Sequence, residues 1–450
     1  MKKIALIALL LVVGCSVKLQ PPTLTAPQSY LYADSNNIGS LTLREDWWTM
    51  FGDTTLNRLV SSALAANNNL KTAASRIEEA RDNMRSARSA FLPSFTLGRT
   101  VGLSGGGGFA QQYAIEPAVS WEIPLFGSLR HATTSALADI EYAKWQYQGV
   151  RLALAAEVAT TYFTLLQYRR DLDIAKRSSQ LRKESAVLID SIFVRGMATG
   201  VNREQAMNLL YTAEADIPLY ERAVRQTLLS LDVLLGNNPD SLAYNATVGT
   251  LITDYTPIEI PAGVPSDIIT RRPDMMSAYS ALVSSAADVK SARVARFPSF
   301  TLTGEGGVVS DDIKKLFHAD SWGWSVLLSF AQPIYNFGAL KSREAAAVER
   351  YNQSLFAYNQ CFIEALEEVE SALVSIATYR EETKKYGQLV QSNAKIAKMT
   401  TALYNNGLSA YLDVIDAERT LYNSQMQYSN IIAQQYINYV NLCKALGGGF

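Results

Sequence analysis

The sequence contains little histidine and cysteine, which argues against metal and thiol chemistry. Among 450 residues there are two histidines, His131 and His318, and three cysteines. Neither histidine lies near a Cys, Asp or Glu cluster with the spacing of metal ligands, so no metal site is predicted. The glycine run 105–108 precedes neither a lysine nor a helix start, which excludes a phosphate-binding loop. No nucleophile motif is present, although a Ser-His-Asp geometry stays open. We expect neither an enzyme nor a resident cofactor.

Blocks of like charge are also missing. The 41 Lys+Arg residues nearly balance the 42 Asp+Glu residues, and the formal net charge is -1. A nucleic-acid partner would leave a basic patch or stripe, so no such partner is predicted. Hydrophobic residues make up 48% of the chain, which is enough to bury large apolar surfaces and unlike a disordered chain.

Apolar runs of membrane-spanning length are not expected after residue 15. The first residues read as a signal peptide, 1–14, in which Lys2 and Lys3 precede an apolar run at 4–13. That run is shorter than the ~20 residues that a spanning helix needs. The segment ends in VVGC, which resembles a lipobox, so we predict cleavage before Cys15 and a covalent lipid on Cys15. An ordinary signal peptide with an incidental cysteine is the alternative. Any insertion of the mature chain must use a closed barrel.

The other two cysteines, Cys361 and Cys443, lie in sequence that we expect to be helical. They have no CxxC spacing and no histidine nearby. We expect packed thiols, and a disulfide between them stays open because the sequence does not show whether their Cα atoms come within reach.

Proline is absent between Pro124 and Pro218 and again after Pro333. Because proline costs about 3 kcal/mol inside a helix, these stretches permit long helices. Apolar residues there alternate at spacings of three and four, as in a coiled coil. The seam comprises Leu355, Tyr358, Phe362, Ala365, Val369, Ala372, Ile376 and Tyr379, and a shorter one comprises Trp145, Leu152, Ala159 and Leu166. A helix over 128–193 would be on the order of 100 Å long, which suits a periplasmic tunnel.

The two halves of the chain repeat each other. FLPSFTL at 91–97 recurs as RFPSFTL at 296–302, and PLFG at 124–127 is matched by PIY at 333–335 with Gly338. The tip around Gly196 recurs around Gly407. Three anchors in one order and at a nearly constant offset indicate duplication of a structural unit. We predict a lipid-anchored linker at 15–45, a first repeat at 46–250 and a second at 251–450.

Each repeat contains a predicted β-hairpin, at about 94–124 and about 299–333. Apolar and small or polar residues alternate along the strands, which suits a membrane barrel, with a small soluble sheet as the alternative. Arg99 interrupts the apolar face and leaves the register of its strand uncertain. Two chains would supply eight strands, and the interior of an eight-stranded barrel is filled by side chains. A pore therefore requires at least three chains.

Several motifs in order resemble the TolC-like outer-membrane efflux family, in its lipoprotein branch serving tripartite pumps. They are Trp47-Trp48 with Phe51, Asp53 and Leu56, then PAGVPSD at 261–267 with RRPD at 271–274, and KALGGG at 444–449. The resemblance implies a mainly α fold with a membrane β-barrel: a homotrimer whose twelve-stranded barrel continues into a long α-helical coiled-coil tunnel. It also implies a periplasmic adaptor protein, an inner-membrane transporter and outer-membrane lipid as partners.

The resemblance also assigns candidate site residues. Asp413 and Asp416 match an Asp-x-x-Asp pair that closes the periplasmic aperture, while stabilisation of a helix start by acidic residues is the alternative role. Some members have an arginine where this chain has Ser409, so a latch at the aperture is in question. Candidate adaptor contacts lie at the two tips: Arg195, Gly196, Met197, Asn406, Gly407 and Leu408.

The resemblance implies passive conduction of small molecules, such as drugs, toxic compounds or ions, to the exterior. Glu116, Glu122 and Glu305, which we expect on the lumen side of the strands, favour cations. A duct for type I protein secretion has the same architecture and is the alternative, although the lipobox favours efflux. A purely structural coiled-coil lipoprotein is the rival from another class, and the paired hairpins argue against it.

Overall fold

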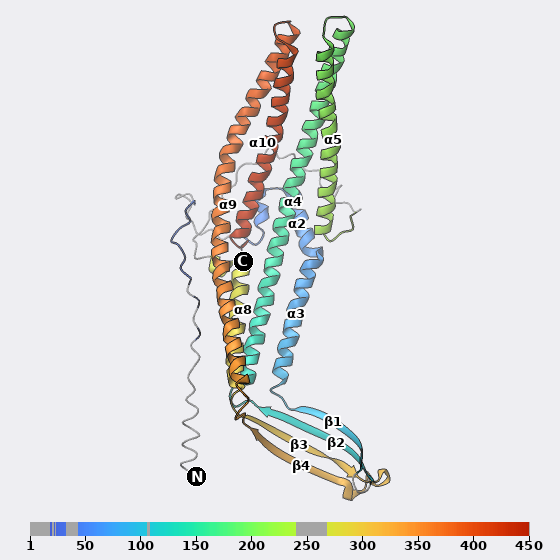
Figure 1. Cartoon of the computed structure of the whole chain (residues 1–450), viewed down its shortest axis with the longest axis vertical. Helices are drawn as coiled ribbons and strands as arrows, with labels where there is room; N and C mark the ends of the chain where they lie inside the picture. Colours follow the sequence, from blue (N-terminus) through green and yellow to red (C-terminus); the bar gives the residue numbers. More distant parts are fainter. Residues whose placement is uncertain are drawn as a thin grey trace. The chain divides into compact units, whose positions relative to one another are not determined.

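The computed structural model describes residues 19, 22, 24–32, 44–105, 109–239 and 268–449. Long helices and one antiparallel sheet make up these residues (Figure 1). The signal segment 1–14, Cys15, the centre of the glycine run, the 261–267 motif and the predicted boundary between 250 and 251 lie outside the described residues. The lipid site and the repeat boundaries therefore stay predictions.

The two halves of the chain contain helices of matching length. Helix α4 (Ser128–Val194) and helix α9 (Ala339–Asn405) have 67 residues each. Helix α5 (Gly200–Leu234) and helix α10 (Tyr411–Ala445) have 35 each. The predicted long helices are thus confirmed. Both coiled-coil seams are buried at nearly all of their positions, with Ala159, Leu166, Ala365 and Val369 fully inaccessible.

One compact unit contains the sheet and the helix segments next to it, within 74–146 and 274–361. The strands are β1 (Ser94–Gly105), β2 (Phe109–Ile123), β3 (Ser299–Ser310) and β4 (Trp322–Ala331). They pair antiparallel in chain order, so both predicted hairpins join into one sheet (Figure 1). Two short 3-10 turns, Ile313–Lys315 and Ala319–Ser321, connect β3 to β4.

The register of β1 is continuous from Ser94 to Gly105, with Arg99 opposite Ile115. The uncertainty over the register at Arg99 is thereby resolved without a bulge. Apolar side chains of one face are largely exposed, including Phe95, Leu97, Trp324 and Val326. Glu116, Glu122 and Glu305 occupy the alternate positions, together with Thr and Ser residues, as predicted.

Helices α3 (Asn68–Ser89) and α8 (Pro273–Val294) belong mainly to this unit. Its core lies where α8 packs on the first part of α9, with Leu282, Val289, Tyr351 and Leu355 buried together. The turns that lead into β3 and out of β2 meet through stacked rings, since the Phe126 and Phe297 centroids are 5.3 Å apart.

The second compact unit contains residues 25–73, 147–273 and 362–450. The 3-10 turn η1 (Trp47–Phe51) and helix α2 (Thr54–Ala66) begin it. Phe51 packs on Phe163, whose ring stacks on Tyr436 at 5.2 Å. Asp53 caps α2 and accepts a 2.6 Å hydrogen bond from the Tyr162 hydroxyl. The Trp47 motif is therefore a core element.

The C-terminal glycines close this unit. Gly447 and Gly448 adopt φ values of 91° and 67°. A Cβ on Gly447 would lie 2.8 Å from the Arg271 carbonyl oxygen, which explains the need for glycine. Arg271 ends the short helix α7 (Ile268–Arg271). The next residue, Arg272, is buried, donates to the Ala445 carbonyl oxygen at 2.8 Å and pairs with Glu368 at 2.7 Å.

The expectation that no apolar stretch of membrane-spanning length follows residue 15 is wrong for α4. One stretch of this helix is long and apolar enough to cross a membrane, and 56% of it is buried within the protein. Such burial is typical of a core helix.

No disulfide joins Cys361 to Cys443. Cys443 is fully buried near the end of α10, and burial raises the pKa of its thiol. The expected packed thiol is confirmed at this position.

Candidate functional site

Each helical hairpin turns through a glycine in the left-handed region. Gly196 has φ 73° and Gly407 has φ 71°. In the first tip, the Gly196 amide donates to the Phe193 carbonyl and the Met197 amide donates to Ile192. In the second, Gly407 and Leu408 make the same two bonds one repeat later. This is the Schellman pattern that ends helices, so the two tips are structurally equivalent.

The tips present their side chains to the surroundings. Met197 is 69% exposed and Leu408 is 73% exposed, and Arg195 and Asn406 are exposed as well. A Cβ added to Gly196 or Gly407 would meet no atom within 4 Å. Each predicted adaptor contact thus includes one exposed apolar residue.

Asp413 and Asp416 lie at the start of α10, both exposed. The Asp413 carboxylate accepts a hydrogen bond from the Ala410 amide at 3.2 Å, which caps the helix. Asp416 pairs with Arg419 at 3.0 Å. Both carboxylates therefore have local partners, and the alternative role as helix-start residues is realised at Asp413. The Ser409 hydroxyl makes no hydrogen bond within the described chain.

An apolar cluster holds the two hairpins together behind the tips. Ile189 from α4, Leu210 from α5 and Val414 from α10 are buried in it. The Tyr404 ring, near the end of α9, packs against Tyr411 with centroids 5.3 Å apart. The tips and the acidic pair consequently stand on one packed platform built from both repeats.

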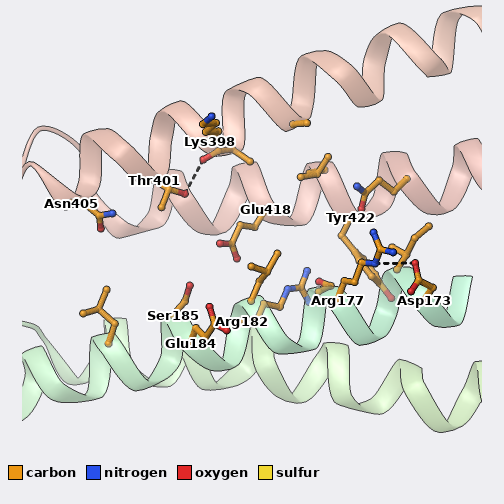
Figure 2. Close-up of a pocket in the computed structure, with 18 residues that line it drawn as sticks. Asp173, Arg177, Arg182, Glu184, Ser185, Lys398, Thr401, Asn405, Glu418 and Tyr422 are labelled. Atoms are coloured by element: carbon orange, nitrogen blue, oxygen red, sulfur yellow. Dashed lines mark hydrogen bonds and ion pairs between the residues drawn. The ribbon is translucent and has the colours of Figure 1, made fainter. Parts of the chain in front are cut away.

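A polar bridge follows the apolar cluster along the helices. The Tyr422 hydroxyl of α10 donates to the Asp216 carboxylate of α5 at 2.6 Å. Arg182 of α4 is 3% exposed, donates to the Leu209 carbonyl at 3.0 Å and lies 5.0 Å from the Tyr422 ring centroid. Figure 2 shows Arg182 on α4 across from Tyr422 and Glu418 on α10.

A groove of about 630 Å³ lies between α4 and the α9–α10 hairpin. Arg177 and Asp173 form an ion pair at 3.0 Å on its α4 wall (Figure 2). Burial raises the pKa of Glu418, which the positive charge of Arg182 partly offsets. The groove between the repeats therefore combines an exposed ion pair on its α4 wall with the buried Arg182 and the partly buried Glu418.

Another carboxyl, Asp171, lies further along α4 and is 3% exposed. Gln167 donates to it at 3.4 Å. Burial raises the pKa of Asp171 to about 6, against smaller opposing effects from hydrogen bonds and Arg170. Asp171 is therefore a strongly perturbed carboxyl.

We expect Tyr422→Phe to lower the free energy of unfolding by about 2 kcal/mol, because it removes a short hydrogen bond to a carboxylate that stays half-buried. Thermal unfolding of the detergent-purified protein measures the loss. Tyr211→Phe is the matched control on α5, since Tyr211 is 59% exposed. Equal unfolding midpoints for wild type and Tyr422→Phe would contradict the bridge.

The family model for outer membrane efflux proteins matches the chain twice, at residues 59–237 and 264–448. The chain belongs to the outer membrane efflux protein family. The duplicated match agrees with the paired helices and hairpins, and the resemblance inferred from the sequence is confirmed.

Named relatives of this family span nearly the whole chain. The solvent efflux pump outer membrane protein SrpC of Pseudomonas putida is 28% identical over 100% of this chain and 98% of its own length. Outer membrane protein OprJ of Pseudomonas aeruginosa is 30% identical over 99% and 95%. The open-state MtrE outer membrane channel of Neisseria gonorrhoeae superposes with a TM-score of 0.86 at 25% identity, covering 96% and 97%.

Proposed function

We propose that this chain is the outer-membrane channel component of an efflux pump, which conducts small molecules passively to the exterior. The observation that carries the proposal is the four-stranded sheet with an exposed apolar face and Glu, Ser and Thr on the alternate positions. A membrane barrel needs apolar side chains on the face that contacts lipid and polar side chains on the face that contacts water. Relatives such as SrpC are named as efflux pump outer membrane proteins, which supports the assignment.

The sheet also supports a trimer. Strands β1 and β4 are its edges, and each has one side without a partner strand in the sheet. An open edge cannot face lipid, so the edges of sister subunits must pair. Three copies supply twelve strands, whereas the eight strands of two copies would enclose only side chains.

The remaining parts of the proposal concern partners and anchoring. We propose a lipid on Cys15, a periplasmic adaptor that contacts the two tips, and an inner-membrane transporter that supplies the energy. The exposed apolar residues Met197 and Leu408 support the adaptor contact. No observation favours a protein-secretion duct, and the named relatives are efflux components.

Conductance in planar lipid bilayers tests the channel. We expect discrete, long-lived current steps from purified trimers reconstituted without any partner protein. Trimers that insert into the bilayer and carry no current would refute the proposal and leave a structural lipoprotein as the explanation.

Ion selectivity tests the acidic pair at the aperture. Replacing Asp413 and Asp416 by Asn is expected to lower the cation-over-anion permeability ratio by about twofold or more, because rings of carboxylates attract cations. Reversal potentials in a salt gradient measure that ratio. Glu381→Gln with Glu382→Gln removes two exposed carboxylates of α9 and serves as the control. An unchanged ratio in the Asp413 and Asp416 variant would place the constriction elsewhere.

A further inference from the structure

The four connections between the sheet and the helices are unusually basic. Each consists of a loop with the adjoining turns of its helix, within residues 85–93, 124–134, 290–298 and 332–343, and the acidic residues Asp82, Asp288 and Glu344 lie just outside these ranges. No Asp or Glu occurs in them, although acidic and basic residues are balanced over the chain. The basic residues, which we call the junction cluster, are Arg85, Arg88, Arg130, Lys290, Arg293, Arg296, Lys341 and Arg343.

The helix dipole accounts for only part of this pattern. Arg88 and Arg293 lie in the last turns of α3 and α8, where positive charge is favoured. Arg130 and Lys341 lie in the first turns of α4 and α9, where the dipole opposes positive charge. The helix dipole does not explain the positive charge at those two residues.

Most of the junction cluster lacks acidic partners. Arg85 pairs with Asp82 and Arg296 pairs with Glu344, each at 2.6 Å. The other six make no ion pair with any described residue of the chain, and all but the half-buried Arg293 are exposed.

Basic residues of α4 and α8 also act together on His131. Burial lowers the pKa of His131, and the nearby charges of Lys290 and Arg130 lower it further. Basic side chains of two helices therefore act on one group at the same junction.

Exposed apolar and aromatic side chains accompany the charges. Ile334, Tyr335 and Phe337 are 94%, 77% and 90% exposed. The Tyr335 and Phe337 rings contact each other with centroids 4.8 Å apart, and Phe337 adopts φ 52°, a strained value for a bulky residue. Aromatic rings beside Lys and Arg are typical of a membrane interface.

We propose that the junction cluster binds the phosphate groups of anionic phospholipids in the leaflet that adjoins the helices. The inference rests on the proposed function, because it places the apolar face of the sheet in the bilayer. Figure 1 shows the ends of α3, α4, α8 and α9 meeting the sheet at one end of the strands, where headgroups of that leaflet would lie. Arginine forks fit phosphate oxygens, and each basic residue near an anionic surface adds to the attraction.

Native mass spectrometry of wild-type trimers in detergent, mixed with phosphatidylglycerol or phosphatidylcholine, tests the proposal. We expect wild type to retain phosphatidylglycerol about tenfold better, with the preference falling as salt rises. A variant with Arg88→Gln, Arg130→Gln, Lys341→Gln and Arg343→Gln is expected to lose the preference. Arg130→Gln and Lys341→Gln remove charges that the helix dipole opposes, whereas Arg88→Gln removes a favourable charge from the last turn of α3.

The matched control replaces four exposed lysines of α9 outside the junction by Gln: Lys384, Lys385, Lys395 and Lys398. Its lipid preference is expected to equal that of wild type. Equal preference in the junction variant and wild type, an equal loss in the control, or stronger retention of lipopolysaccharide than of phosphatidylglycerol would each overturn the proposal.

The same preparations separate this inference from the proposed function. Wild-type trimers that conduct but show no lipid preference refute the junction cluster alone. Wild-type trimers that never conduct refute the channel, and the lipid preference that supports the present inference would then have no membrane context.

Discussion

Gly307→Ala is expected to abolish assembly of the channel, although it adds a single methyl group. A Cβ at Gly307 would lie 2.2 Å from the Ile115 carbonyl oxygen and 2.8 Å from the Glu116 Cα. Both atoms belong to the backbone of the neighbouring strand β2, so no side chain can rotate away. The strands must separate where the first hairpin pairs with the second. Overpacking of this kind costs about 3 kcal/mol.

The close approach has a local cause. The pairing of β2 with β3 passes from Ile115–Val308 to Ala118–Glu305, and Pro117 lies in the interval. Proline has no amide to donate, so the ladder is interrupted there. Gly307 allows the backbones to approach closely at that point, and a side chain would remove this contact.

The amount of heat-stable trimer recovered from outer membranes measures the effect. Gly304→Ala on the same strand is the matched control, because a Cβ there meets no atom within 4 Å. We expect near-wild-type trimer yield from the control and little from Gly307→Ala. Normal assembly of the Gly307 variant would show that the β2–β3 pairing is dispensable or looser than described.

Long helices and hairpins could be predicted because their signals are local. Proline-free heptads run through α4 and α9, and strict alternation marks the strands on both sides of Arg99. Duplication strengthened both predictions, since each anchor in one half has a counterpart in the other. The tip residues Gly196 and Gly407 were identified in the same way, and their matching φ values confirm the equivalence.

The polar bridge could not be predicted, because its partners are distant in the sequence. Tyr422 and Asp216 are separated by 206 residues. A partial signal exists in α4, where buried residues continue the three-and-four spacing through Ala175, Ser179, Arg182, Ala186 and Ile189. A charged residue such as Arg182 at a seam position is costly to bury, so its position alone marks a polar layer.

Whether Asp413 and Asp416 close the aperture depends on neighbouring subunits, and the sequence and structure of a single subunit do not decide it. Within the subunit, Asp413 caps α10 and Asp416 pairs with Arg419. Those contacts follow from spacing along a helix and could be expected from sequence. A ring of carboxylates is a property of the assembled aperture, and the selectivity experiment addresses it.

Asp171→Asn is expected to stabilise the protein at neutral pH, against the usual direction for a buried substitution. Asp171 has a folded-state pKa of about 6, raised by burial from an ordinary value of 3.8. The folded state therefore binds the proton more tightly than the unfolded chain. The stability of wild type falls as pH rises from about 4 to about 6. Above that range the destabilisation by the buried charge stays at its full value. A shift of this size corresponds to roughly 3 kcal/mol per subunit.

Unfolding midpoints measured between pH 4 and pH 8 test this linkage. Asn keeps a similar shape and can accept from Gln167, but it carries no charge to desolvate, so its curve is expected to be flatter and higher above pH 6. Asp173→Asn is the matched control two residues away, because the Asp173 side chain is 40% exposed and pairs with Arg177. The control should keep the pH slope of wild type. A wild-type slope in the Asp171 variant would mean that this carboxyl stays charged in the folded protein, held by Arg170 and its hydrogen bonds more strongly than burial opposes it.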